Sequence, residues 1–345
     1  MGGFRVLVVV PTLNEAAHVE SVVTGLLAEQ ASFRAFQVVV ADGGSTDGTV
    51  GLAEALGRRH PALSVIHNRD RLQSAAINLA VRKFGADADI LIRCDAHSQY
   101  PEGFCARLIE TMTARGADAV VVPMDSRGGG NCVQRAVAWV SNSPIGTGGS
   151  AHRAGHRSGF VDHGHHAAFR LDMFRKAGGY DETFSHNEDA EFDCRQRALG
   201  GKIYLDGEIR IGYQARSTLA GLWRQYLRYG AGRSRTVRRH PGSARLRQLL
   251  VPGHLVLTAA CLAVAPWAPQ ALLWPLFYLL LLAGTSVGFA VRHRSACGLL
   301  TGPAAAVMHT AWGGGFLGAL LRRREQVWRA SAQVPLEVTA PLLNP

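Results

Sequence analysis

Acidic residues stand directly after short apolar runs at several points in the first half of the chain. Asp42 follows the run VVVA and precedes Gly43-Gly44-Ser45. A carboxylate in that position can accept hydrogen bonds from a nucleobase N–H or a ribose hydroxyl, and the glycines let a ligand come close to the backbone. The alternative is a plain turn or a helix cap. Asp42 is therefore a candidate ligand-binding residue.

Asp95 and His97 form a second candidate group, in the tripeptide Asp-Ala-His. Two residues of this spacing just beyond a strand can turn to one side, where a carboxylate and an imidazole offer a divalent cation two ligands. Diphosphate oxygens and water would complete its coordination, and a nitrogen ligand shifts the preference from Mg²⁺ towards Mn²⁺. Such a cation would neutralise a departing diphosphate. The alternative is a surface turn.

A third acidic group opens a run with helical spacing, HNEDAEF at residues 186–192. Carboxylates favour the N-terminal end of a helix because of its dipole, and ordinary helix chemistry explains part of the cluster. The functional interpretation makes one of these carboxylates the general base for an incoming hydroxyl.

Short apolar strands alternate with helical patterns around these residues. We expect strands at residues 5–10, 36–41, 63–67, 89–93 and 119–123, and helices at residues 15–30, 47–59 and 73–84. This alternation predicts an α/β fold with a doubly wound, mostly parallel sheet, whose ligands bind beyond the carboxyl ends of the strands. Asn14, Glu15, Asp42 and Asp95 stand at such ends. Neither G-x-G-x-x-G nor G-x-x-x-x-G-K-[ST] follows the first strand, which disfavours a dinucleotide fold and a P-loop.

The composition is uneven along the chain. The 345 residues carry 37 Lys+Arg and 26 Asp+Glu, a formal net charge of +11. Residues 248–321 contain no acidic residue and no Lys, whereas residues 233–247 contain six Arg. Basic residues beside apolar spans are typical of membrane proteins, so we expect membrane lipid as a partner and no nucleic acid. Six Cys without C-x-x-C spacing exclude a disulfide scaffold and a zinc finger, and fit a reducing compartment.

Two stretches are long enough to cross about 30 Å of hydrocarbon, residues 249–266 and 271–290. Arginines precede the first and follow the second, which predicts an inner (cytoplasmic) membrane protein whose catalytic domain is cytoplasmic and whose loop 267–270 faces outward. A third apolar stretch, residues 296–321, also ends in arginines. It is either a re-entrant or interfacial segment or a third span.

Five motifs in order resemble the inverting family 2 glycosyltransferases with a GT-A fold. They are PTLNE at 11–15, DGGSTDGT at 42–49, DAH at 95–97, NED at 187–189 and QYLRY at 225–229. Within that family, the likeness is to the membrane-bound glucosyltransferases of succinoglycan and exopolysaccharide assembly. The resemblance covers residues 4–240 with strong motifs and the apolar tail more loosely.

The resemblance implies donor-binding roles for the first motifs. Glu15 and Asp42 match the uridine contacts, and Pro11 and Thr12 match residues that shape the uridine pocket. Asn78 is similar to a residue near the nucleotide diphosphate.

The later motifs match the family's metal and base positions. Asp95 and His97 would hold the divalent cation, Mn²⁺ or Mg²⁺, and Asp189 would be the catalytic base with Glu188 beside it.

The last motif resembles a Q-x-x-R-W sequence near the donor diphosphate and the acceptor. Gln225, Arg228 and Tyr229 are the matching residues, with Arg228 assisting the departing diphosphate. Tyr in place of Trp keeps an aromatic surface but speaks against the processive synthases, and the chain is too short for their pore helices. Transfer of a single sugar is therefore favoured.

The expected function is that of a membrane-bound inverting hexosyltransferase. It would move a sugar, with glucose favoured, from a UDP-sugar to a lipid-linked saccharide in exopolysaccharide or cell-envelope glycan assembly. The alternatives are a membrane-tethered nucleotide-sugar-binding module without catalysis, and a nucleotidyltransferase. The presence of both Asp95 and Asp189 speaks against the first, and the lack of a Gly-rich first loop with a basic residue speaks against the second.

Four parts are expected along the chain. They are a GT-A catalytic domain at 1–218, an interfacial QxxRY helix with an Arg-rich linker at 219–247, a transmembrane region of two to three helices at 248–321, and a C-terminal tail at 322–345. Five His between residues 150 and 169 are expected to form a polar pocket wall near the acceptor in preference to a second metal site.

Overall fold

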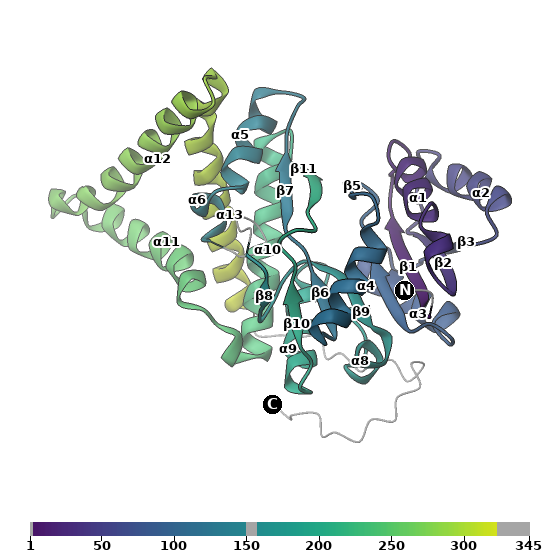
Figure 1. Cartoon of the computed structure of the whole chain (residues 1–345). Helices are drawn as coiled ribbons and strands as arrows, with labels where there is room; N and C mark the ends of the chain where they lie inside the picture. The colour runs from purple at the N-terminus through teal and green to yellow at the C-terminus, as the bar shows by residue number, and fades with distance from the viewer. Residues whose placement is uncertain (1–2, 150–156, 323–345) are drawn as a thin grey trace. The chain divides into compact units, whose positions relative to one another are not determined.

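The computed structural model describes residues 3–149 and 157–322, apart from the side chain of His166. The described residues form two units (Figure 1), of which unit 1 comprises 3–124 and 157–213, and unit 2 comprises 125–149 and 214–322. This division places residues 125–149 with the C-terminal helices, whereas the sequence suggested one continuous domain up to residue 218. His152, His156 and residues 323–345 lie outside the described residues.

Unit 1 is built on an eight-stranded sheet in the order β3-β2-β1-β4-β9-β6-β10-β8. Its strands are β1 Arg5–Thr12, β2 Ala35–Asp42, β3 Leu63–His67, β4 Ile90–Arg93, β6 Ala119–Val121, β8 Gly159–Phe160, β9 His166–Arg170 and β10 Ile203–Leu205. The β1–β2, β1–β4, β2–β3 and β6–β10 pairs are parallel, and β9 pairs antiparallel with β4 and β6, as β8 does with β10. The predicted mostly parallel α/β sheet is confirmed; the antiparallel insertion of β9 was not foreseen.

Helices cover both faces of this sheet, as a doubly wound fold requires. They are α1 Val19–Leu27, α2 Thr49–Arg59, α3 Gln73–Phe84, α4 Phe104–Arg115, α8 Leu171–Lys176 and α9 Glu188–Ala198. The period of two along β1 explains how one strand serves both faces. Val6 and Val8 pack into the core formed with α1, α2 and α4. Leu7 and Val9 pack into the core formed with α3, α8 and α9.

A second sheet, of three short strands, stands apart from the main sheet. Strand β5, Ser98–Gln99, pairs with β11, Ile211–Gln214. Strand β7, Met124–Arg127, carries the chain from unit 1 into unit 2.

Unit 2 is helical over most of its length. Its elements are α5 Cys132–Ser141, α6 Pro144–Thr147, α10 Leu219–Arg239, η2 Pro241–Ser243, α11 Leu246–Val264, η3 Pro269–Leu272, α12 Leu273–Arg292, η4 Ala296–Leu300 and α13 Thr301–Leu320. Helices α10 and α13 make close backbone contact, since a Cβ at Gly230 or Gly315 would lie within 2.0 Å of a carbonyl oxygen on the other helix. Small residues permit this approach.

The Arg-rich segment expected as a linker is folded. It comprises the end of α10, all of η2 and the start of α11. Arg233 is buried there, and its guanidinium donates to Gln248 Oε1 at 3.1 Å and to the carbonyl oxygen of Ser243. At least one of the six arginines therefore stabilises the fold of unit 2.

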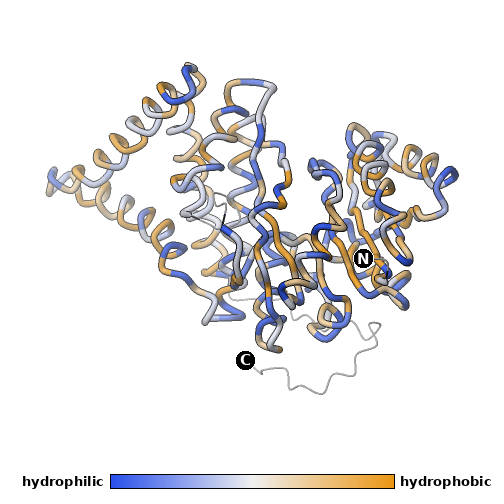
Figure 2. Tube along the Cα trace, in the orientation of Figure 1, coloured by the Kyte–Doolittle hydropathy of each residue, from blue (hydrophilic) through white to orange (hydrophobic). Residues whose placement is uncertain are grey.

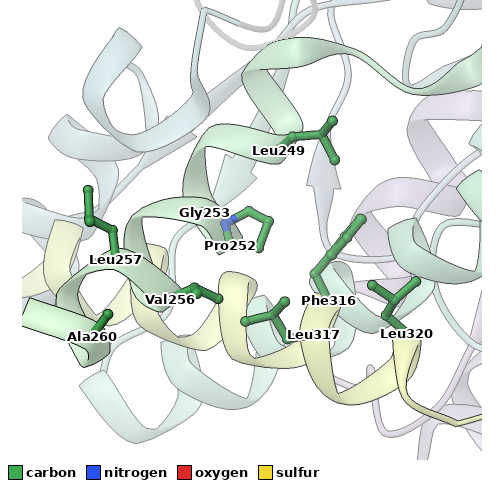
Figure 3. A pocket seen from close by; sticks show the side chains of 9 residues that line it. All are labelled: Leu249, Pro252, Gly253, Val256, Leu257, Ala260, Phe316, Leu317 and Leu320. Carbon is green, nitrogen blue, oxygen red and sulfur yellow. The ribbon is translucent and has the colours of Figure 1, made fainter. Parts of the chain in front are cut away.

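Two helices of unit 2 are long and apolar enough to cross a membrane, α11 and the continuous segment Pro269–Arg292. Figure 2 shows hydrophobic residues along most of α11 and α12. The third apolar stretch forms α13, one unbroken helix of 20 residues that runs through its three consecutive glycines. An apolar groove of about 480 Å³ lies between α11 and α13 (Figure 3), lined by side chains such as Leu249, Val256 and Phe316.

A disulfide joins Cys132 on α5 to Cys297 in η4. The cysteine spacing gave no sign of this pair, and a reducing compartment does not predict it. The partners are 165 residues apart in the chain, and only the packing of α5 against η4 brings them together.

Candidate active site

The polar residues predicted at strand ends gather at one edge of the main sheet. Thr12 at the end of β1 is in register with Asp42 at the end of β2, and β4 ends at Arg93, on the other side of β1. Figure 1 shows β1 and β2 side by side. The carboxyl ends of parallel strands share an edge, so the loops that follow them meet there.

Asp42 is buried, and neighbouring groups of the protein occupy the hydrogen-bond acceptor sites of its carboxylate. Oδ1 accepts from the backbone N–H groups of Gly44 and Ser45, both at 2.8 Å, and Oδ2 accepts from the hydroxyls of Thr12 at 2.9 Å and Ser45 at 2.5 Å. Burial raises the pKa of Asp42, but these hydrogen bonds outweigh burial and lower it. Four bonds fill the acceptor sites of a carboxylate, so Asp42 holds the shape of the turn Gly43–Ser45.

Further hydrogen bonds tie the loop after β1 to the loop after β2. Asn14 adopts a positive φ of 58°, and its Oδ1 accepts from the backbone N–H of Thr46 at 2.9 Å. The backbone N–H of Glu15 donates to Thr49 Oγ1 at 2.8 Å. Pro11 is half-buried at the base of the first loop. The PTLNE and DGGSTDGT motifs thus form one connected wall.

His97 connects this wall to the loop after β4. Its Nδ1 lies 2.8 Å from Glu15 Oε1. Glu15, expected at the uridine, and His97, expected at the metal, therefore contact each other.

Asp95 is held from three sides. Gln73 Nε2 donates to Asp95 Oδ1 at 2.6 Å, His165 Nε2 lies 3.5 Å from Oδ2, and Arg93 Nε lies 3.9 Å from Oδ1. Burial raises the pKa of Asp95, but the hydrogen bond with His165 and the charge of Arg93 outweigh burial and hold it below its ordinary range. Asp95 is thus an ionised carboxylate at the sheet edge.

The donor set at this edge fits a divalent cation that is completed by substrate. Within residues 3–149 and 157–322, no group of three or more His, Cys, Asp or Glu side chains converges on a metal position. Mg²⁺-type sites commonly use one or two carboxylates, with phosphate oxygens and water as the other ligands. Asp95 offers one such carboxylate and His97 an imidazole nitrogen, and His165, whose Nε2 lies 3.5 Å from Asp95 Oδ2, has a buried Nδ1 with no hydrogen-bond partner among the described residues.

The acid pair at the start of α9 surrounds a buried guanidinium. Arg93 Nη2 lies 3.1 Å from Glu188 Oε1, and Arg93 Nη1 donates to Asp189 Oδ1. The hydroxyl of Tyr180 donates to the same oxygen of Asp189 at 2.7 Å. Three carboxylates, those of Asp95, Glu188 and Asp189, therefore share one cation at the sheet edge.

The surroundings of Glu188 shift its pKa. Burial raises the pKa of Glu188 to about 7, and the negative charge of Asp189 adds to the rise while Arg93 opposes it. Neighbouring carboxylates with unequal environments are a frequent arrangement in sites of acid–base chemistry.

Asn78 is buried below the acid pair. Its Nδ2 donates to the carbonyl oxygen of Tyr180 at 2.8 Å and to Glu182 Oε1 at 2.9 Å, while its Oδ1 accepts from the backbone N–H of Tyr180 at 2.9 Å. These contacts make it an anchor for the turn around Tyr180. None of them supports the expected place beside a diphosphate.

Gln225, Arg228 and Tyr229 lie on α10 in unit 2. Gln225 Nε2 donates to the Tyr229 hydroxyl at 3.0 Å, one turn along the helix. The geometry of unit 1 does not bear on these three residues, and their expected contact with the donor stays a prediction.

Three residues at the site lie outside the five motifs: Arg93 and Tyr180 are buried, and His165 is a half-buried member of the histidine group expected as a polar pocket wall. Arg93 ends an apolar strand, Tyr180 follows two glycines, and His165 belongs to the His-rich segment. A charged residue at the end of the buried run ILI was the one available signal, because an arginine in a core requires acidic partners. The partners themselves lie far away in sequence, 96 residues in the case of Asp189.

Residues 7–178 match the sequence model of the family described as Glycosyl transferase family 2. Over 331 residues the chain is 42% identical to the succinoglycan biosynthesis protein ExoA of Rhizobium meliloti (strain 1021), an alignment that covers 93% of this chain and 96% of that protein. It is 22% identical over 243 residues to a dolichyl N-acetyl-alpha-D-glucosaminyl phosphate 3-beta-D-2,3-diacetamido-2,3-dideoxy-beta-D-glucuronosyltransferase of Methanococcus voltae, covering 67% of this chain and 74% of that protein.

Among solved structures, the chain is similar to the mannosyltransferase PcManGT from Pyrobaculum calidifontis in complex with GDP-Man and Mn²⁺. The TM-score is 0.61 at 18% identity, with 93% of this chain and 88% of that chain covered. At this identity the likeness concerns the fold, and it agrees with the predicted GT-A architecture.

Proposed function

The chain belongs to glycosyl transferase family 2, and we propose on that basis that it transfers a single sugar from a UDP-sugar to a lipid-linked saccharide during exopolysaccharide assembly. Glucose is the sugar proposed first. The name of the 42% identical relative, a succinoglycan biosynthesis protein, supports the pathway class. The five motifs in order support the donor class.

One observation carries the catalytic part of this proposal. The candidate base Asp189 and the candidate metal ligand Asp95 both lie within ion-pair distance of the same buried guanidinium, that of Arg93. Inverting transfer needs a base on one side of the sugar and charge neutralisation on the other, held in a fixed relation. A shared rigid cation between the two carboxylates supplies such a relation.

The proposed reaction is a single in-line displacement. The oxygen of the acceptor hydroxyl forms a bond to the anomeric carbon as the bond from that carbon to the diphosphate breaks, so the configuration inverts. Asp189 takes the hydroxyl proton, and UDP leaves with the bonding electrons. Glu188, beside the base, adds negative charge to its surroundings.

The donor is proposed to lie against the wall formed by the PTLNE and DGGSTDGT loops. There Glu15 would contact the uridine, while Thr12, Pro11 and the turn held by Asp42 would shape its pocket. A divalent cation, held by Asp95 and His97, would supply neutralisation of the charge that develops on the diphosphate.

The QxxRY residues are proposed to act on the same substrate. Arg228 would contribute a further positive charge to the diphosphate, and Gln225 and Tyr229 would contact the donor.

The test is sugar transfer by the purified full chain in detergent with Mn²⁺. UDP-glucose, UDP-galactose and GDP-mannose should be compared as donors, each with a polyprenyl diphosphate saccharide and with water alone as acceptor. We expect UDP release that depends on the lipid acceptor, with UDP-glucose the best donor. Tight UDP binding without transfer to any acceptor would contradict the proposal and support a binding module instead.

We also propose that α11 and α12 span the inner membrane, with unit 1 in the cytoplasm. The two apolar helices and the arginines at the start of α11 and the end of α12 support this orientation. Pro269→Cys in the loop between them should react with a membrane-impermeant maleimide added from outside. The unmutated chain is the control, and labelling from the cytoplasmic side alone would contradict the topology.

A further inference from the structure

We propose that Arg93 is a positioning residue for sugar transfer, which together with Tyr180 fixes the carboxylate of Asp189 in one orientation. The inference rests on the proposed function, because Asp189 is the proposed base. It adds two residues that belong to none of the five motifs.

The first argument is the burial of Arg93. Only 5% of the residue is exposed, and a cation removed from water must be compensated by charged partners and hydrogen bonds. Its compensation comes from a different part of the chain, Glu188 and Asp189 on α9. Arg195 on α9, by comparison, pairs with Glu191 one turn earlier on its own helix. Arg93 instead faces the acid pair at the proposed reaction site.

The second argument is the geometry of the contacts. The two terminal nitrogens of Arg93 reach different carboxylates, Nη2 at Glu188 and Nη1 at Asp189. A planar guanidinium holds its donors in a fixed fork, so it also fixes the two carboxylates relative to each other. Asp189 Oδ1 accepts from both Arg93 and the Tyr180 hydroxyl. Two donors on one oxygen define the rotamer of the side chain.

The third argument is the rigidity of Tyr180 itself. Two hydrogen bonds link its backbone to the Asn78 side chain, and a third joins Asn78 to the side-chain carboxylate of Glu182. Gly179 has a positive φ of 70°, and a Cβ there would lie 2.6 Å from Asn78 Oδ1. The Tyr180 ring packs edge-on against Phe169 and Phe174, with centroids 6.1 Å and 5.5 Å away. The hydroxyl that touches Asp189 is therefore presented from a rigid turn.

Loss of the Arg93 guanidinium should lower turnover and leave donor binding nearly unchanged. Without the guanidinium fork, Glu188 and Asp189 repel each other in a buried site, and Asp189 loses its orientation towards the acceptor hydroxyl. A misplaced base slows the chemical step, whereas the uridine wall around Asp42 and Glu15 is untouched. A structural defect would instead reduce the amount of folded enzyme.

The experiment compares Arg93→Lys and Tyr180→Phe with the control Arg195→Lys, in the full chain purified in detergent. The control makes the same substitution on α9, the helix that carries the acid pair, in a partly buried ion pair between Arg195 and Glu191 at 2.7 Å. The measurements are kcat, donor KM, UDP affinity by calorimetry and the melting temperature.

Arg93→Lys should lower kcat about 100-fold and Tyr180→Phe about tenfold, fractions of the roughly 10²–10⁴-fold that a general base contributes. Donor KM and UDP affinity should stay within about threefold. Arg195→Lys should keep kcat within about threefold, whatever its melting temperature. The double variant Arg93→Lys/Tyr180→Phe should lose less than the product of the single losses, because both residues act on one carboxylate.

Two results would overturn the inference alone. In the first, the wild type is active and Asp189→Asn is inactive, but Arg93→Lys and Tyr180→Phe keep a near-normal kcat. The other is a fall in kcat that tracks the melting temperature equally in Arg93→Lys and Arg195→Lys. A wild type that releases no UDP with any acceptor would overturn the proposed function, and this inference with it.

Discussion

Asp42 and Glu188 are both buried carboxylates of unit 1, and their surroundings shift their pKa values in opposite directions. Asp42 accepts four hydrogen bonds from its own turn and from Thr12, and its pKa is lowered. Glu188 lies beside a second carboxylate and shares one guanidinium with it, and its pKa is raised to about 7. The hydrogen-bonding capacity of Asp42 is filled by the protein itself, whereas Glu188 lies in a region of excess negative charge.

We interpret this difference as one between a region that fixes the conformation of a loop, around Asp42, and a region that takes part in chemistry, around Glu188. A carboxylate whose acceptor sites are filled stabilises a loop and has little left for a substrate. A cluster with three carboxylates and one guanidinium has negative charge to offer, to a proton or to a metal cation. We therefore propose that the first region shapes the nucleotide pocket and that the second carries out proton transfer.

The largest expected effect is that of metal removal on the acid cluster. Excess EDTA should reduce turnover at least about 10³-fold, because a bound cation contributes several kcal/mol and each 1.36 kcal/mol is tenfold. Mn²⁺ should restore activity at least as well as Mg²⁺, since His97 offers a nitrogen ligand. Asp95→Asn should resemble the chelated enzyme. Full turnover in EDTA would remove the distinction between the two regions.

A smaller effect is expected at the other carboxylate. Asp42→Asn should raise the donor KM about tenfold, because losing roughly one charged hydrogen bond loosens the turn Gly43–Ser45 that shapes the donor pocket, while kcat stays within a few-fold. The measurement is initial-rate kinetics over a range of UDP-glucose. A large fall in kcat at unchanged KM would place Asp42 in the chemistry and break the contrast.

The melting temperature of the same variant should reveal whether the pKa of Asp42 is lowered or raised in the folded protein. A lowered pKa gives stability that is present above the ordinary Asp value of 3.8 and is lost as the pH falls through the folded-state pKa. The wild type should therefore melt higher than Asp42→Asn at pH 7, and the gap should shrink below pH 3.8. A gap that grows towards acid pH would contradict the hydrogen-bond account.

Glu188 should show the opposite dependence, with the smallest effect. Its raised pKa gives stability that is complete below the ordinary value of 4.5 and is lost as the pH rises through about 7. Glu188→Gln removes the buried charge, so at pH 8 and without metal it should melt about 3 °C above the wild type. The two proteins should differ less at pH 5. Thermal scans at both pH values check this, and equal melting temperatures at pH 8 would show that Glu188 is not strained by its neighbours.

Local patterns were enough to predict the sheet and the edge at which the polar residues meet. Strand β3 and helix α3 have the predicted limits, because apolar runs and helical spacing are properties of neighbouring residues. The parallel pairing of β1 with β2 and β4 then brings the loops after them together. The insertion of β9 was missed because nothing local distinguishes an antiparallel strand in a mixed sheet.

Partners that are distant in sequence could not be predicted. Arg93 lies 96 residues from Asp189, and Asn78 lies 102 residues from Tyr180. Ordinary helix chemistry was expected to explain part of the acidic cluster at 186–192, but Glu191 in that cluster is buried in an ion pair with Arg195. Its replacement should therefore destabilise the fold, so it is a poor control for the acid pair.

The most direct measurement is the comparison of Asp189→Asn with Asp172→Asn, by sugar transfer and calorimetric UDP binding. Asp172 is an exposed carboxylate in the first turn of α8, a matched position on another helix. Asp189→Asn should lose turnover by at least about 10²-fold with UDP affinity within a few-fold, whereas Asp172→Asn should behave as the wild type. Near-normal transfer by Asp189→Asn, with activity abolished in Glu188→Gln, would contradict the assignment of Asp189 as the base.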